Sequence, residues 1–425
     1  MASNVRQRLE RLRRLGLHRG TGHLPSHDEG TPTEFWPAHR IAPSPLETTV
    51  PGRVVESPLG ACYLVEEARP TTLARGGYPL AECLQLSGEM VARLDNNPTL
   101  HHFDFRRAAF IDTETSGLDL GTGTYAFLIG VGTFEGERFI LRQYLLRDPS
   151  EEAAALHLLA RQMETCDSLV TFNGRHFDIP LLNTRYALNR QRSPFPHTPH
   201  LDLLPPARRL WRERLPSRAL GDLERNILGH QRTQADVPGW LIPQIYLNYV
   251  RSGDARDLAR VFYHNMEDII SMVSLATHLT RAFSGAPEQR EAREAMMLGR
   301  WYELRGQLDE AERAYRTALA GSLPPTLRQR VLRDLGFLLK RMARREEAKE
   351  IWEAWLASAE AIHDLTPYIE LAKHYEWHEA NWEVAHAWTL RAIAQAQRWS
   401  HTPQRAAALA ALEHRLARLA RKLAG

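Results

Sequence analysis

Two acidic residues, Asp112 and Glu114, stand at the end of an apolar segment, residues 108–111, and a polar turn at residues 115–117 follows them. The apolar segment predicts a buried β-strand. Alternate residues of a strand face the same side of a sheet, so both carboxylates point in one direction if the strand extends to Glu114. Two like charges at the edge of an apolar core repel each other and resist desolvation, and a divalent cation between them relieves both effects. An isolated Asp-x-Glu is more often a solvated strand end, so a metal site requires further ligands elsewhere in the chain.

Length and composition describe a globular protein of several domains. The chain has 425 residues, which is too long for one hydrophobic core and predicts two or three domains. No apolar run reaches the ~20 residues of a membrane span, and the Arg-rich start of the chain lacks the apolar stretch of a secretory signal. We therefore expect no membrane association and a cytoplasmic location. Lysine supplies only four of the 54 basic residues. Arginine binds phosphates well, so this preference is compatible with nucleic-acid binding, but biased genome composition is the explanation that we favour.

Changes in composition along the chain predict four regions. Residues 1–51 read as a basic amphipathic helix followed by a flexible Pro-rich linker, and residues 52–104 as a small extension with a hairpin around Ser57-Pro-Leu-Gly60 and a helix at 79–94. Residues 105–284 contain three β-rich runs at 108–114, 125–133 and 138–146, a helix, a short strand at 168–172 and further helices. Three antiparallel strands, a helix, a returning strand and more helices resemble the ribonuclease-H-like plan, an α/β fold with a mixed sheet. Residues 287–425 read as an all-α domain.

Further candidate ligands lie at the start of one helix and within another. Asp178 follows the strand break at Asn173-Gly174 and precedes a helix, where an acidic residue also serves as an N-cap. His264 and Asp268 are four residues apart and share one face of a predicted helix. Tyr263 is rotated by about 140° from Asp268 on that helix and faces elsewhere. Glu267, beside Asp268, is expected to be solvated.

Together these motifs resemble the DEDD exonuclease superfamily, to which polymerase proofreading domains belong. The resemblance rests on Phe110-Ile-Asp-Thr-Glu-Thr-Ser-Gly-Leu118, Asn173-x-x-x-Phe-Asp178 and His264-x-x-x-Asp268, in this order. One feature departs from the superfamily. Its tyrosine branch places a tyrosine four residues before the last aspartate, and its histidine branch places a histidine five residues before it. Here His264 stands four residues before Asp268, and Tyr263 stands five residues before it. We assign His264 as the base, because imidazole accepts a proton near neutral pH, and keep Tyr263 as the alternative.

The resemblance implies hydrolysis of phosphodiester bonds with two divalent metal ions. Asp112, Glu114, Asp178 and Asp268 would hold two Mg²⁺ or Mn²⁺ ions about 3.5–4 Å apart, and His264 would deprotonate the attacking water. Hard oxygen ligands suit these ions. The three cysteines are widely spaced and show no zinc pattern. Candidate substrate contacts are Thr113, Asn173 and Tyr263. The direction of cleavage, from the 3′ end, is implied by the resemblance alone.

The last region resembles tetratricopeptide repeats. Ala311, Ala348 and Ala385 are separated by 37 residues each (348 − 311 and 385 − 348) and mark the second helices of three predicted helical hairpins. Gly299 and Gly336 occupy equivalent positions in the first helices of two hairpins. Residues 403–424 predict a helix that caps the repeats.

The whole arrangement resembles the bacterial mitomycin-repair exonucleases, which combine a ribonuclease-H-like exonuclease domain with tetratricopeptide repeats and act beside a DEAD/DEAH-type helicase. The hairpin around Ser57 and the His264-Asn265-x-x-Asp268 motif fit that family. The resemblance implies a 3′-5′ exonuclease that acts on DNA in repair, with a helicase or another protein bound to the repeats. Two alternatives stay open: the same enzyme acting on RNA, and a catalytically silent scaffold.

Overall fold

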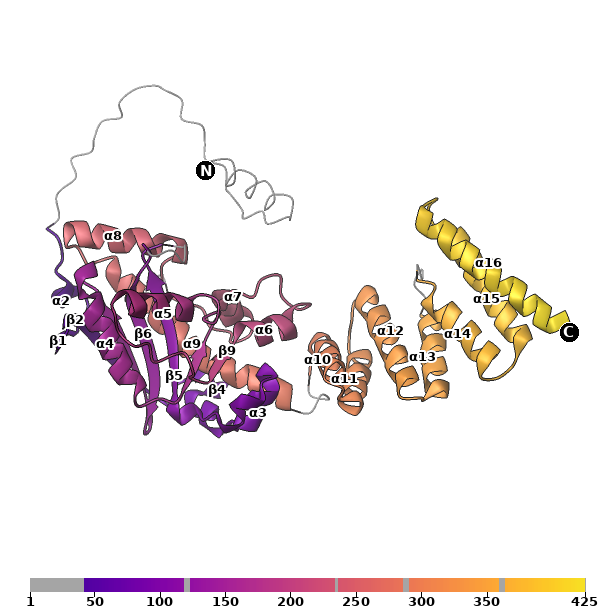
Figure 1. Cartoon of the computed structure of the whole chain (residues 1–425), viewed down its shortest axis with the longest axis horizontal. Helices are drawn as coiled ribbons and strands as arrows, with labels where there is room; N and C mark the ends of the chain where they lie inside the picture. The colour runs from indigo at the N-terminus through magenta and orange to yellow at the C-terminus, as the bar shows by residue number, and fades with distance from the viewer. Residues whose placement is uncertain (1–41, 118–122, 234–235, 286–289, 359–363, 425) are drawn as a thin grey trace, which may run out of the picture. The chain divides into compact units, whose positions relative to one another are not determined.

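The computed structural model describes residues 42–117, 123–233, 236–285, 290–358 and 364–424, and its helices and strands carry the labels of Figure 1. The basic helix predicted near the N-terminus lies outside the described residues, as does the linker up to residue 41. The first described helix is α2 (Leu46–Thr49). Residues 43–425 belong to one compact unit. In the described part of the chain, no helix combines the length and the apolar character that a bilayer crossing requires.

A mixed sheet forms the centre of the first part of the chain. Its strands follow the order β1-β2-β7-β6-β5-β8-β9. Their bounds are β1 Arg53–Ser57, β2 Gly60–Pro70, β5 Ala108–Thr115, β6 Ala126–Glu135, β7 Arg138–Leu145, β8 Ser168–Thr171 and β9 His200–Asp202. The antiparallel meander β5-β6-β7 is confirmed, and β8 returns parallel to β5. The predicted hairpin is β1-β2, and pairing of β2 with β7 makes it part of the same sheet. Strands β3 (Ala74–Arg75) and β4 (Tyr78–Pro79) form a separate pair.

Helices cover both faces of the sheet (Figure 1). In β5, Ala109 and Ile111 enter an apolar cluster with α4 (Glu152–Met163), α5 (Asp178–Leu188) and α8 (Ile242–Ser252). Ala108 and Phe110 enter the cluster on the other face, with most of α9 (Leu258–Ser284). The alternation continues past the apolar residues, so that positions 112 and 114 belong to the face covered by α9.

The helix predicted at residues 79–94 is divided in two. A 3-10 helix, η1 (Leu80–Gln85), is followed by α3 (Gly88–Asp95), and the Ser87 hydroxyl accepts a bond from the Met90 N–H at the new helix start. A Cβ at Gly88 would lie 2.2 Å from the His101 carbonyl oxygen, so the chain passes too close there for another residue. Further short 3-10 helices are η2 (Pro98–His102), η3 (Phe105–Arg107), η4 (Pro149–Glu151) and η5 (Gly239–Leu241). Two α-helices, α6 (Leu204–Trp211) and α7 (Leu220–Asn226), precede η5.

The remaining chain is helical and arranged in hairpins. The helices are α10 Ala292–Leu304, α11 Leu308–Ala320, α12 Pro325–Arg341, α13 Arg345–Ala357, α14 Thr366–Trp377, α15 Trp382–Gln397 and α16 Pro403–Ala424. The three marker alanines each stand fourth in α11, α13 and α15, as the 37-residue spacing predicts. A Cβ at Gly299 would lie 2.6 Å from the Tyr315 ring, and one at Gly336 2.3 Å from the Trp352 ring. Small residues therefore allow the paired helices to approach, while the tetratricopeptide assignment stays a prediction.

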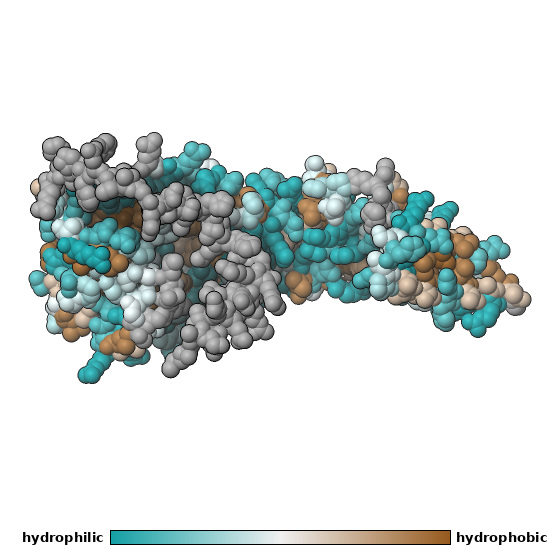
Figure 2. All heavy atoms as spheres, turned by 90° about the horizontal axis from the view of Figure 1, so that it is seen from above, coloured by the Kyte–Doolittle hydropathy of each residue, from teal (hydrophilic) through white to brown (hydrophobic). Residues whose placement is uncertain are grey.

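Large apolar side chains are exposed on the last helices. Trp377 is 54% exposed and Trp382 37%, and Leu390 and Leu423 are exposed as well. Figure 2 shows apolar side chains gathered over the C-terminal helices, on a surface that is otherwise mostly hydrophilic. Exposed tryptophan is typical of protein interfaces.

Candidate active site

Strand β5 presents Asp112 and Glu114 toward α9. Both residues are half-buried, and the intervening Thr113 is buried on the other face. The side chain of Asn265 on α9 donates from Nδ2 to Asp112 Oδ2 at 2.7 Å. Asp112 pairs with Gly130 of β6, where a Cβ would lie 2.1 Å from Asn265 Oδ1. Glycine at this position therefore allows the amide to reach Asp112.

Asn265 is itself held in place by Gln143 of β7. The Gln143 amide Nε2 donates to Asn265 Oδ1 and to the Phe262 carbonyl oxygen, both at 2.9 Å. The sequence marks Asn265 only as part of a motif and does not indicate a role for Gln143. A glutamine at a buried position of β7 was the available signal, because buried polar groups need partners.

Asp178 is the first residue of α5 and is buried. Thr113 Oγ1 donates to Asp178 Oδ1 at 2.5 Å, which joins the first motif to the second. Thr113 is therefore engaged with a carboxylate, and its predicted contact with substrate stays a prediction.

The loop before α5 is fixed by Asp202 at the end of β9. Asp202 accepts the N–H of Asn173 at 2.8 Å and that of Arg175 at 3.2 Å. Asn173 has φ +71, in the left-handed region, and a Cβ at Gly174 would lie 2.5 Å from Thr171. No hydrogen bond to the Asn173 side chain is found within the described ranges, which leaves its amide available for the predicted contact with a phosphate.

Helix α9 places His264 beside Asp268. His264 Nε2 lies 3.5 Å from Asp268 Oδ2, and Nδ1 lies 2.7 Å from Asp236 Oδ1. Tyr263 is engaged elsewhere, since its hydroxyl oxygen accepts the Thr233 N–H at 3.1 Å. The geometry brings His264, and not Tyr263, next to the carboxylates. The choice between the two as base is still a prediction.

An arginine that the sequence analysis missed completes the group. The Arg232 guanidinium bonds to Asp268, to both oxygens of Glu224 at 2.6 and 2.7 Å, and to Asp236 at 3.4 Å. Burial by itself would lower the pKa of Arg232, but the carboxylates of Asp268 and Glu224 outweigh burial and raise the pKa. Arg232 follows α7 in a segment without regular structure, so no helical or strand spacing linked it to α9.

The charged forms of the four motif carboxylates are destabilised by their surroundings. Burial raises the pKa of Asp112 well above its ordinary value, and the charges of Asp268, Glu114 and Asp178 add to the effect. Burial also raises the pKa of Glu114 to about 8, with His264 opposing, and that of Asp178 to about 6 despite the bond from Thr113. The pKa of His264 is raised: burial lowers it, but Asp268 and Glu114 outweigh burial. Such perturbation indicates that the carboxylates are close together and that Arg232 and His264 compensate their charge only in part.

These residues fit divalent metal ions. Oxygen donors of carboxylates suit Mg²⁺ and Mn²⁺, and ligand atoms of Glu114, His264 and Asp268 lie within 4.8 Å of one another. Glu346, His374 and Glu379 form a similar group between the later helices. There the Lys349 ammonium lies 2.7 Å from Glu379 and 3.7 Å from Glu346, so a cation is already present and that group needs no metal.

The expectation that Glu267 is solvated is wrong. The residue is only 5% exposed, where a solvated side chain was predicted. It pairs with Arg75 at 2.9 Å and with His230 Nε2 at 2.6 Å. The side of α9 that faces away from the sheet is covered by these residues, so the acidic side chain is buried and neutralised.

Two comparisons with known proteins bear on this site. A family model described as the RNase_H superfamily matches residues 109–280, a range that contains all four motif carboxylates and His264. The uncharacterized protein YprB of Bacillus subtilis (strain 168) is 32% identical over 323 residues, which are 74% of this chain and 76% of that protein.

Proposed function

We propose that this chain, which belongs to the same family as YprB of Bacillus subtilis and carries a domain of the RNase_H superfamily, is a metal-dependent nuclease. The observation that carries the proposal is the convergence of Asp112, Glu114, Asp178 and Asp268 from β5, α5 and α9. Burial raises the pKa of all four carboxylates, and the charges of neighbouring motif carboxylates add to the effect at Asp112 and Glu114. A cluster of buried carboxylates with raised pKa values is unfavourable in a structural site and is characteristic of a metal-binding active site.

The protein residues have separable roles. Bound divalent ions would neutralise charge on the phosphate and lower the pKa of water, and the four carboxylates would hold them. Asn265 fixes the orientation of Asp112, and Thr113 that of Asp178. A proton on His264 Nδ1, donated to Asp236 Oδ1 at 2.7 Å, would leave Nε2 free to accept a proton from water.

We further propose that the enzyme is a DEDD-type exonuclease that removes nucleotides from the 3′ end of DNA during repair. The order of the three motifs and the resemblance to the mitomycin-repair exonucleases support this assignment. The exposed Trp377 and Trp382 support a protein partner, such as a helicase, on the helical hairpins.

Labelled DNA and RNA strands with Mn²⁺ or Mg²⁺ test the proposal. The wild type should release labelled mononucleotide first from 3′-labelled DNA and shorten 5′-labelled DNA in steps. Asp112→Ala and His264→Ala should be inactive. Asp257→Ala, at an exposed carboxylate just before α9, is the matched control and should keep full activity.

Each other outcome has a definite meaning. Preference for RNA would support the first alternative, the same enzyme acting on RNA. If the wild type and Asp112→Ala were equally inert on every strand, the chain would be a scaffold. Full activity of His264→Ala together with an inactive Tyr263→Phe would reverse the assignment of the base.

A further inference from the structure

A cavity of about 880 Å³ between α6 and the first helices of the C-terminal region is lined by arginines. The six are Arg208, Arg209, Arg212, Arg218, Arg300 and Arg341. Only two acidic residues, Glu303 and Asp334, share the lining in the part of the chain that the structure describes. A concentration of one charge in a cavity attracts a ligand of the opposite charge.

The two acids are already neutralised. Arg300 pairs with Asp334 at 2.9 Å, and Arg341 with Glu303 at 3.1 Å. Within the described ranges, the other four arginines have no carboxylate at ion-pair distance. Arg218 donates only to backbone carbonyl oxygens at 3.0 Å, and its Nε is buried without a partner. The cavity therefore keeps four uncompensated positive charges.

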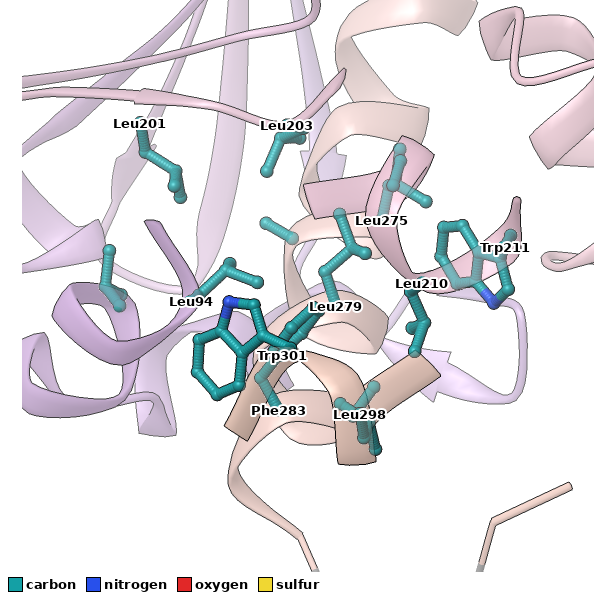
Figure 3. Close-up of a cluster of buried hydrophobic side chains, with 14 of the residues drawn as sticks. Leu94, Leu201, Leu203, Leu210, Trp211, Leu275, Leu279, Phe283, Leu298 and Trp301 are labelled. Atoms are coloured by element: carbon teal, nitrogen blue, oxygen red, sulfur yellow. The ribbon is translucent and has the colours of Figure 1, made fainter. Parts of the chain in front are cut away.

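The walls of the cavity are held rigidly. Leu210 and Trp211 on the buried side of α6 pack with Phe283, Leu298 and Trp301 in one apolar cluster (Figure 3). Trp211 Nε1 also donates to Glu294 on α10 at 2.9 Å. Because this face of α6 is buried, Arg208 and Arg212, one turn apart, are exposed on the opposite face. The helix that carries these arginines is thus held in place by its buried face.

The arginine cavity continues toward the carboxylates along one chain segment. Arg218 lines the arginine cavity, and Leu220 and Gly221 line a second cavity of about 600 Å³ that contains His264 and Asp268. Two residues of chain span at most about 7 Å. The two cavities therefore adjoin at this segment, so a strand that ends at the carboxylates can reach the arginine cavity within a few nucleotides.

We propose that the arginine cavity binds the phosphate backbone of the nucleic-acid strand whose end is cleaved at the carboxylates. This inference rests on the proposed nuclease function. Guanidinium groups form paired charge-assisted bonds with phosphate oxygens, and an arginine-lined groove can follow a backbone without reading its bases. An acidic peptide would satisfy the same charges, but the connection to the carboxylate cavity favours a nucleic-acid strand.

The test is binding of a fluorescein-labelled oligothymidylate in EDTA, where no hydrolysis occurs, over a range of salt concentrations. The double variant Arg208→Ala/Arg212→Ala should bind about tenfold or more weakly, and the slope of log K against log salt should fall by about 1.4, for two lost phosphate contacts. Arg208→Lys/Arg212→Lys should keep most of the slope. Arg398→Ala/Arg421→Ala, at two exposed arginines, one just after α15 and one in α16, is the matched control and should bind like the wild type.

Rates of hydrolysis on a long and a short substrate distinguish a failure of the arginine site from a failure of the proposed nuclease function. The alanine double variant should degrade long oligothymidylate more slowly than the wild type, yet hydrolyse the p-nitrophenyl ester of thymidine 5′-monophosphate equally well, because that ester is too short to reach the arginines. Equal binding and equal salt slopes for variant and wild type would overturn the arginine site while leaving the nuclease in place. Arginine-dependent binding of polyglutamate, without binding of oligothymidylate, would also overturn it.

Discussion

Replacing Arg232 by methionine removes the guanidinium that Glu224 and Asp268 share. The Arg232 side chain is 10% exposed and that of Glu224 only 1%. Removing one partner of a buried ion pair costs about 3–5 kcal/mol, because the remaining charge stays buried without compensation. At roughly 2–4 °C per kcal/mol for a domain of this size, the unfolding midpoint should fall by roughly 6–20 °C.

A double-mutant cycle shows whether the loss comes from the stranded charge. Glu224→Leu should cost less than Arg232→Met, because Arg232 still has Asp268 and Asp236 as partners. Arg232→Met/Glu224→Leu should be more stable than Arg232→Met alone, since the buried carboxylate is gone. Thermal unfolding of the three variants and the wild type provides the measurement.

Arg225→Met is the matched control for this cycle. Arg225 also belongs to the α7 region but is 59% exposed and pairs with Asp222 on the surface. Its loss should change stability by no more than about 0.5 kcal/mol. Strictly additive losses in the double variant, or an Arg232→Met protein as stable as Arg225→Met, would refute the interpretation of Arg232 as the charge that compensates Glu224.

Four further outcomes are expected. Asn265→Ala removes the donor to Asp112 and should lower activity and metal affinity about 10–100-fold, measured by hydrolysis rates and by calorimetric titration with Mn²⁺. Gly130→Ala places a methyl group 2.1 Å from Asn265 Oδ1 and should lower stability by about 1–3 kcal/mol in thermal unfolding. Burial, and then the charge of Arg175, lowers the pKa of His200 from 6.5 to about 4. Between these pH values the unfolded chain binds a proton more readily than the folded protein, so the free energy of unfolding should fall by roughly 2–3 kcal/mol from pH 7 to pH 4.5. The fall should be smaller in His200→Asn, which lacks the titrating group. Chelation with EDTA should lower the unfolding midpoint of the wild type, and Mg²⁺ should restore it, because metal bound only to the folded state stabilises that state.

Local periodicity explains what the sequence could predict. The alternation of β5 placed Asp112 and Glu114 on one face, and the structure puts both residues on the side of α9. The spacing of Ala311, Ala348 and Ala385 placed three helices correctly, because each alanine packs where paired helices cross. In both cases the pattern in the sequence reflects a local arrangement, either the alternation within one strand or the packing of two consecutive helices.

Contacts between distant segments explain what the sequence could not predict. Strand β9 has three residues, too few to show a period, and is recognised only through its pairing with β8. Arg232 reaches Asp268 across 36 residues from a segment without regular structure. Glu267 lies on a helix that is buried on almost all sides, so hydrophobic patterning did not distinguish its buried face from a solvated one.

The residues that were missed also define the charge of the site. The four motif carboxylates and their ion-pair partners form one group, in which Glu224 and Asp236 add two further negative charges. Within the described ranges, Arg232 and His264 are the cationic side chains paired with this group. With all six carboxylates ionised and His264 protonated, the group would carry four more negative than positive charges, and the raised pKa values of the motif carboxylates show that burial opposes this fully ionised state when no further cation is bound. One divalent ion would neutralise half of this excess and two would neutralise all of it. The balance of charge therefore supports two metal ions, on grounds independent of the motif spacing.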